Sequence, residues 1–253
     1  MEYIRNEKNV KIAEAICEAI HENAAYLSEI DGAIGDGDHG VNMNKGFLMA
    51  KERLRADMSF SESMKTISRT LVMDIGGSMG PIYGTMFSRI ARACKQEAKL
   101  TKEVFLKALQ DALQGLQELA GAKEGDKTLI DTLAPAIRAY EQAMQEGRSY
   151  AACLCALQQG AEAGREHTKE LVAKIGSSKT GRAKPRLSGC GSDELLYHSN
   201  DDGASDVRGY PRGIAAGKMQ NSYVRSVSFS LHSNESSANG LSDLHEEDRD
   251  VII

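Results

Sequence analysis

The stretch Glu29-Ile-Asp-Gly-Ala-Ile-Gly-Asp-Gly-Asp-His-Gly40 places three aspartates, Asp31, Asp36 and Asp38, within eight residues. Its glycines interrupt any helix and favour a tight turn. Three ionised carboxylates a few ångströms apart repel one another unless a cation lies between them. Because Mg2+ is typically held by carboxylates together with substrate phosphates, the stretch predicts a magnesium site for a phosphorylated ligand. A solvated acidic turn without function is the alternative interpretation.

Apolar residues at helical spacing continue on both sides of this stretch. They predict one helix over residues 8–30, which delivers Asp31 at its C-terminal end, and another from His39 to about Leu54. Ser59 and Glu62 have the spacing of a capping box and predict the start of a third helix, which runs through Leu71. Four more helices are expected around residues 86–94, 101–119, 129–144 and 150–175, with Asp126 or Thr128 capping the helix at 129.

No convincing strand alternation precedes residue 180, so the chain is expected to be all-α. Short loops between long amphipathic helices indicate antiparallel neighbours. Tryptophan is absent and aromatic residues make up only 5% of the chain, so aliphatic side chains and methionine are expected to fill the core.

Composition limits the other classes of function. The net charge of −5 without a basic block argues against nucleic acid as a partner. No apolar run approaches the length of a membrane span, and the polar N-terminus lacks the apolar region of a signal peptide, so we expect a cytoplasmic protein with no membrane association. The five cysteines show no disulfide or zinc pattern, and most are expected to be small buried side chains.

The chain changes character near its end. From about Ser188 to Ile253 it is rich in Ser, Asn, Asp and Gly, and the apolar periodicity disappears. Such a composition buries little surface and tends to disorder. We therefore expect a helical domain over residues 1–184 and an atypical tail over 185–253.

Three motifs, taken together and in this order, resemble the nucleotide-binding L subunit, or L domain, of dihydroxyacetone kinases. The resemblance covers roughly residues 5–184. The motifs are Leu27-Ser-Glu-Ile-Asp-Gly-Ala-Ile-Gly-Asp-Gly-Asp-His-Gly-Val-Asn-Met-Asn44, Gly76-Gly-Ser-Met-Gly-Pro-Ile-Tyr-Gly84 and Gly121-Ala-Lys-Glu-Gly-Asp-Lys-Thr-Leu-Ile-Asp131.

The resemblance implies an antiparallel barrel of about eight helices with a nucleotide, ADP or ATP, at one end. It implies that Asp31, Asp36 and Asp38 bind two Mg2+ ions that bridge the nucleotide phosphates. Phosphoryl transfer depends on such positioning and charge neutralisation, and glycine loops let backbone N–H groups approach phosphate. The residues implied to line the nucleotide are His39, Gly40, Val41, Asn42, Met79, Gly80, Gly121, Leu129 and Arg182.

The resemblance also implies a partner, because the sugar of these kinases sits on a separate K subunit or domain. In one mode of the family the bound nucleotide is rephosphorylated by a phosphohistidine carrier of the phosphoenolpyruvate-dependent phosphotransferase system; in the other, ATP is consumed. The expected activity is that of a glycerone kinase subunit acting on dihydroxyacetone or a related short keto-sugar. A homodimer is left open, as are two alternatives: a non-catalytic nucleotide or metal sensor, and an inactive truncated product.

The chain departs from the family after Gly181-Arg-Ala-Lys184. The usual Asp-Pro-Gly or Asp-Ala-Gly turn and the apolar last helix are missing. Codons for residues 189–202, displaced by one nucleotide, allow a string that begins Asp-Ala-Gly and continues as an apolar helix. This suggests a frameshift near residue 185, which resequencing would decide. If the tail is genuine, the last helix is lost, and weak nucleotide binding and a disordered end are expected.

Overall fold

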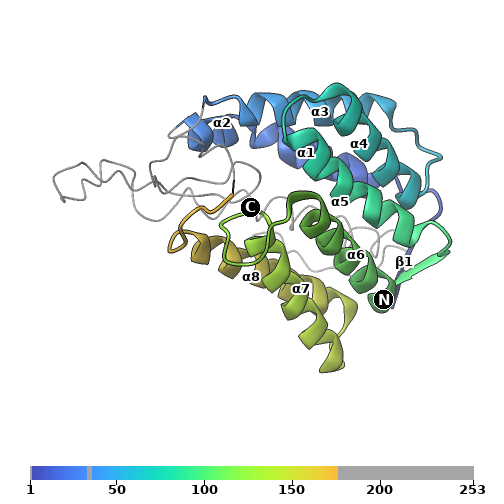
Figure 1. The fold of residues 1–253 in the computed structure, drawn as a ribbon. Coiled ribbons are helices and arrows are strands. Elements are labelled where there is room, and N and C mark those ends of the chain that lie inside the picture. Colours follow the sequence, from blue (N-terminus) through green and yellow to red (C-terminus); the bar gives the residue numbers. More distant parts are fainter. Residues whose placement is uncertain (1, 33–35, 176–253) are drawn as a thin grey trace, which may run out of the picture.

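Eight helices and one pair of short strands form the part of the chain that the computed structural model describes, residues 2–32 and 36–175 (Figure 1). Helices α1 to α5 form one group, and α6, α7 and α8 lie beside it as a second group (Figure 1). The elements in chain order are β1 (Tyr3–Arg5), α1 (Lys11–Glu22), α2 (Ala24–Gly32), α3 (His39–Arg53), α4 (Phe60–Asp74), α5 (Met79–Cys94), β2 (Lys99–Thr101), α6 (Lys102–Ala120), α7 (Ile130–Gln145) and α8 (Tyr150–Thr168).

The single helix expected over residues 8–30 is wrong, because α1 ends at Glu22 and α2 begins at Ala24. Asn23 separates them with φ −104° and ψ 6°, and its amide nitrogen donates to the Ala19 carbonyl at 2.7 Å. Asparagine side chains compete in this way with the helical backbone bonds. The apolar pattern continues across the break, so periodicity alone does not reveal it.

Two further expectations need correction. Helix α8 ends at Thr168 rather than near residue 175. Strands β1 and β2 pair antiparallel, with Ile4 opposite Leu100, although no strand was expected before residue 180. Each strand has only three residues, which is too short for alternation to be recognised.

Several predicted helix starts are confirmed. Helix α3 begins at His39. The Ser59 hydroxyl accepts from the Glu62 backbone N–H at 3.2 Å, and the Glu62 carboxylate accepts from the Ser59 N–H at 2.9 Å, which completes the capping box of α4. Thr101 caps α6 by accepting from the Val104 N–H at 3.4 Å. Local capping chemistry therefore fixes these boundaries.

Glycines show that two pairs of consecutive helices, α4 with α5 and α7 with α8, run antiparallel. An added Cβ at Gly80 would lie 2.5 Å from the Ile75 carbonyl oxygen, whereas one at Gly84, a turn later, would lie 3.2 Å from the Ser68 carbonyl, further back along α4. The same reversal joins α7 and α8, because Gly160 approaches Pro135 and Gly164 approaches Asp131. The expected antiparallel packing of neighbours is thus present, and closure of the set into a barrel stays a prediction.

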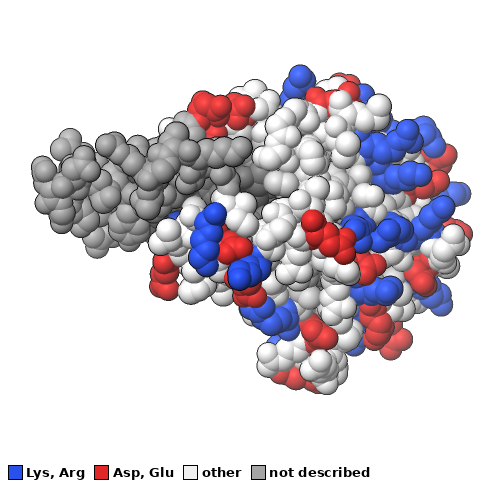
Figure 2. Space-filling view, in the orientation of Figure 1, with Lys and Arg blue, Asp and Glu red and all other residues white. Residues whose placement is uncertain are grey.

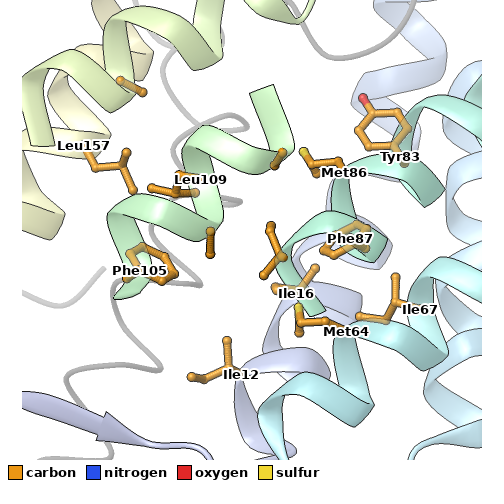
Figure 3. Close-up of a cluster of buried hydrophobic side chains, with 14 of the residues drawn as sticks. Ile12, Ile16, Met64, Ile67, Tyr83, Met86, Phe87, Phe105, Leu109 and Leu157 are labelled. Carbon is orange, nitrogen blue, oxygen red and sulfur yellow. The ribbon is translucent and has the colours of Figure 1, made fainter. Parts of the chain in front are cut away.

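The core runs through both groups of helices (Figure 3). Phe47 of α3 meets Phe87 of α5 edge-on, with ring centroids 5.9 Å apart. Phe105 of α6 lies 5.9 Å from the Tyr140 ring of α7. Three cysteines, Cys17, Cys94 and Cys153, are buried thiols, as expected; Cys155 is exposed. Among the described residues no helix is long and apolar enough to cross a membrane.

A buried asparagine ties the first strand to the core helices. The Asn6 amide nitrogen donates to the carbonyls of Cys94 and Glu97, at 2.8 and 2.7 Å, and its oxygen accepts from the Ser61 N–H at 3.1 Å. Because Asn6 is only 5% exposed, these bonds satisfy groups that water does not reach. They fix the end of α5 against the start of α4.

Some expectations fall outside the described residues. They are the role of Arg182, the fate of Cys190, the last helix, and the proposed frameshift with its tail over residues 185–253.

Candidate functional site

The three aspartates of the opening stretch come together. Carboxylate oxygens of Asp31, Asp36 and Asp38 lie within 4.8 Å of one another. Asp31 is half-buried in the last turn of α2, whereas Asp36 and Asp38 are exposed ahead of α3. Oxygen donors clustered in this way fit a hard divalent cation such as Mg2+. We call these three residues the acidic triad.

Asp38 occupies the position before α3 where an aspartate usually caps the helix, but its side chain does not cap it. Instead its Oδ2 accepts from the Asn42 amide at 2.7 Å, and its own N–H donates to Asp36 at 3.4 Å. Loss of hydration and then the adjacent Asp36 carboxylate raise the pKa of Asp38. The raised pKa of Asp38 therefore reflects in part the crowding of like charges in the triad.

His39 and Gly40 form the buried start of α3. The His39 N–H donates to Asp31 Oδ2 at 3.4 Å, which joins α2 to α3 at the triad. Burial lowers the pKa of the His39 imidazole, although the charges of Asp31 and Asp38 oppose this shift. A neutral imidazole leaves the negative charge of the triad to be balanced by a cation.

Val41, the residue after Gly40, is 63% exposed. It points away from the core beside the triad, where an apolar side chain is available for contact with a ligand. Of the residues predicted from the first motif, the structure therefore connects Asp31, Asp36, Asp38, His39 and Asn42 by contacts, and places Gly40 and Val41 within the same turn of α3.

The second glycine motif forms the loop into α5. Gly77 has φ +71°, which glycine adopts without strain, and an added Cβ at Gly76 or Gly77 would meet nothing within 4 Å. The buried Met79 and Gly80 begin α5, and Ser78 provides no side-chain cap. Backbone N–H groups at an uncapped helix start suit an anion.

Packing places the start of this loop beside the middle of α3, the helix that follows the triad. An added Cβ at Gly46 of α3 would lie 2.7 Å from the side chains of Leu71 and Ile75, just before the loop. Gly46 follows Asp38 by about two turns of α3, roughly 12 Å along the helix. Cations at the triad and an anion at the loop are therefore compatible with one extended ligand.

The third motif forms the loop between α6 and α7. Gly121 is exposed and ends α6 in the left-handed conformation, with φ +62°. Leu129 immediately precedes α7 and packs against the core. Neither one takes part in the hydrogen bonds that connect the triad to the start of α3. The expected cap by Asp126 or Thr128 is wrong, because the N-cap of α7 is Leu129 and no side chain caps it. Thr128, one residue earlier, accepts from the Ile130 N–H at 3.2 Å, and Asp126 accepts from the Lys123 N–H at 2.9 Å.

Sequence reasoning missed the residue that holds this loop together. Asp131 is 3% exposed and accepts from the backbone N–H groups of Gly125 and Thr128, the latter at 2.7 Å. These hydrogen bonds stabilise a loop in which Lys127 has φ +61°, an unusual conformation for a residue with a side chain. The spacing Thr128-Leu-Ile-Asp131 is a capping-box signal that could have identified it.

The triad has no ion-pair partner among the described residues. On the face shown in Figure 2, Lys and Arg gather at the end where β1 lies, whereas acidic atoms occupy the position of α2. Among the described residues, none of the ion pairs includes Asp31, Asp36 or Asp38. The clustered charge is thus open to a cation from solution.

Comparison with known proteins gives a consistent result. A family model described as the DAK2 domain matches residues 33–186. The ADP-binding subunit DhaL of the PEP-dependent dihydroxyacetone kinase of Escherichia coli is 34% identical over 153 residues, which cover 60% of this chain and 73% of that protein. Its counterpart in kinase 1 of Listeria innocua is 33% identical over 186 residues, covering 72% and 88%.

A solved structure shares the fold. The dihydroxyacetone kinase of C. freundii, crystallised with AMP-PNP and Mg2+, superposes with a TM-score of 0.54 at 20% sequence identity. The match covers 90% of this chain but 33% of the kinase chain, so this chain spans about a third of that protein. At this identity the likeness supports the helical fold alone.

Proposed function

The chain belongs to the DAK2-domain family, and on that premise we propose that it is the Mg–nucleotide-binding subunit of a kinase for dihydroxyacetone or a related short keto-sugar. The acidic triad carries this proposal. Three carboxylates whose oxygens lie within 4.8 Å, with no ion-pair partner among the described residues, favour a positive counter-charge between them. The DhaL relatives are named as ADP-binding kinase subunits, which supports a nucleotide as the accompanying ligand.

Each part of the site has a distinct chemical role in the proposal. Two Mg2+ ions held by Asp31, Asp36 and Asp38 would supply charge neutralisation to the nucleotide phosphates. Asn42 orients Asp38 through its 2.7 Å hydrogen bond, and the His39 N–H orients Asp31. The uncapped N–H groups at Met79 and Gly80 receive phosphate oxygens, for which backbone N–H groups at a helix start are suited.

The base end of the nucleotide is proposed to lie near Gly121 and Leu129, with Val41 as an apolar contact beside the phosphates. Arg182 is proposed to pair with the nucleotide. The sugar is proposed to bind to a separate K subunit, as the resemblance to the L subunit implies. Catalysis here consists of holding the phosphoryl group in line for that partner, which is the main requirement of phosphoryl transfer.

We assign phosphoenolpyruvate, through a phosphohistidine carrier, as the source of the phosphoryl group. The relatives from Escherichia coli and Listeria innocua are both named as PEP-dependent, which favours this mode over consumption of ATP. In this mode ADP stays bound between turnovers. Activity would then depend on the carrier and continue without added ATP, whereas turnover with ATP alone would contradict the assignment.

Calorimetry and a reconstituted kinase assay test the proposal together. ADP should bind in Mg2+ and fail to bind in EDTA, and phosphorylation of dihydroxyacetone should appear only when a K subunit is added. Binding without activity in the complete mixture would favour a non-catalytic sensor. Absence of Mg2+-dependent binding would indicate an inactive product and overturn the proposal.

A further inference from the structure

Helix α2, which carries Asp31, differs from the other helices in how it is held. None of its nine residues is buried. By contrast α1 buries side chains such as Ile12 and Ile16, and α4 buries Met64 and Ile67. Segments that bury little apolar surface open at low free-energy cost, so α2 belongs to the least stable part of the fold.

The contact that α2 makes with α3 depends on Gly40. An added Cβ at Gly40 would lie 1.9 Å from the Ala24 carbonyl oxygen and 2.6 Å from both the backbone nitrogen and the hydroxyl of Ser28. The Ala24 oxygen is backbone and cannot rotate away. Any side chain at position 40 would therefore push α2 off α3.

The same face of α2 carries the metal ligand. Ala24, Ser28 and Asp31 follow the i, i+4, i+7 spacing of one helical stripe. The first two touch Gly40, and the third reaches the His39 N–H at 3.4 Å. A displacement of α2 at Gly40 is therefore a displacement of the Asp31 carboxylate from Asp36 and Asp38.

Two opposing influences act on α2 at this contact. Repulsion from Asp36 and Asp38 drives the Asp31 carboxylate away, and in α2 only the partly buried Leu27, which packs against the core, opposes it. The Ser28 hydroxyl, enclosed at the same contact, has no hydrogen-bond partner among the described residues. A divalent cation shared by the three carboxylates reverses the sign of the interaction and draws α2 inward.

We propose that the cations of the triad complete the docking of α2, which the core holds only through the partly buried Leu27, and that Gly40 is the positioning residue whose missing side chain lets α2 deliver Asp31. This inference rests on the proposed function and deepens it. Gly40 acts through Asp31, because its lack of a Cβ determines whether the third carboxylate reaches the ions.

Amide hydrogen exchange of the full-length chain tests the docking of α2. Peptides covering residues 24–32 are compared in EDTA, in Mg2+ alone and in Mg2+ with ADP, with α4 as the internal reference. At free Mg2+ about ten times its dissociation constant, exchange in α2 should slow about tenfold, because binding requires the docked state. Amides of α4 that exchange through local opening should not change, whereas any that exchange through global unfolding should slow by the factor that the overall stabilisation sets. Equal protection of α2 in EDTA and in Mg2+ would overturn the inference.

A pair of glycine variants tests the positioning role. Gly40→Ala should weaken Mg2+ or Mn2+ binding by about 10- to 100-fold, the range seen when the support of metal ligands is lost. Its melting temperature in EDTA should stay near that of the wild type, because α2 buries no side chain. Gly160→Ala introduces a comparable clash between α7 and α8, with Cβ 2.8 Å from the Pro135 carbonyl oxygen. That control should lower the melting temperature and leave cation affinity unchanged.

The outcomes separate this inference from the function on which it rests. Wild-type affinity in Gly40→Ala would refute the positioning role. Tight Mg2+–ADP binding by the wild type with no change in α2 exchange would overturn the docking of α2 alone. No cation binding by the wild type would overturn both. If Gly40→Ala does not fold, the exchange experiment on the wild type still tests whether cations dock α2.

Discussion

Replacing Asp36 by Asn should stabilise the protein in EDTA and remove its stabilisation by Mg2+–ADP. The substitution keeps the shape of the side chain and removes one of three charges, and with it two of the three pairwise repulsions in the triad. At 4.8 Å, each repulsion between unit charges is worth about 0.9 kcal/mol in water. Because Asp36 and Asp38 are exposed and salt screens over about 8 Å, the total falls to about 1 kcal/mol at physiological ionic strength.

The effect of ligand has the opposite sign. At roughly a hundred times its dissociation constant, a ligand that binds only the folded state stabilises it by about 2.7 kcal/mol. For a chain of this size, that is an increase of roughly 5–10 °C in melting temperature for the wild type. The Asp36→Asn variant should show little of this increase, because the ions lose a charged ligand.

Thermal unfolding of both proteins, in EDTA and in Mg2+ with ADP, measures the two effects. The variant should melt about 2–4 °C above the wild type in EDTA and below it in Mg2+–ADP, and lower salt should widen the first difference. A variant that is destabilised in EDTA, or that keeps the full increase with Mg2+–ADP, would refute the reasoning. The latter result would support the alternative interpretation, in which the three aspartates lie in a solvated acidic turn without function.

Three other predictions concern the fold. Asn6→Ala should lower the free energy of unfolding by about 1–3 kcal/mol in urea titrations, since it removes the side-chain hydrogen bonds to the Glu97 carbonyl and from the Ser61 N–H; a loss near zero would contradict this role. Ser59→Ala should cost about 1 kcal/mol by the same measurement through loss of the capping box, and cation affinity should not change. Burial raises the pKa of Cys17 to about 12, so between pH 7 and 9 its thiol should stay protonated and should not react with iodoacetamide, whereas the exposed Cys155 should react. Mass spectrometry locates the label, with Cys155→Ser as the control. Rapid labelling of Cys17 would be inconsistent with its burial.

Local chemistry explains which parts of the fold were predictable from sequence. Ser59 with Glu62, and Thr101, are capping signals whose partners lie three residues away, so no tertiary information is needed. Clustering of Asp31, Asp36 and Asp38 was predictable for the same reason, because glycines confine all three to one short stretch. The start of α3 at His39 follows from the turn residues before it, and the antiparallel packing of neighbouring helices follows from the short loops between them.

Features that depend on distant contacts could not be predicted in this way. The pairing of β1 with β2 joins segments almost a hundred residues apart, and neither strand is long enough to show a pattern. The closeness of Gly40 to α2 appears only when the two helices pack, because the sequence cannot separate a glycine that contacts phosphate from one that admits a neighbouring helix. The break at Asn23 is hidden by apolar residues on both sides, and the brace at Asp131 becomes visible only with the loop it holds.

Anomalous diffraction from crystals grown with Mn2+ and ADP tests the central claim most directly, because it locates the cation without reference to activity. The account predicts a manganese peak among the side chains of Asp31, Asp36 and Asp38, with the diphosphate extending from it toward the loop that precedes Met79. Crystals that contain ordered ADP but no metal between those three side chains would contradict it.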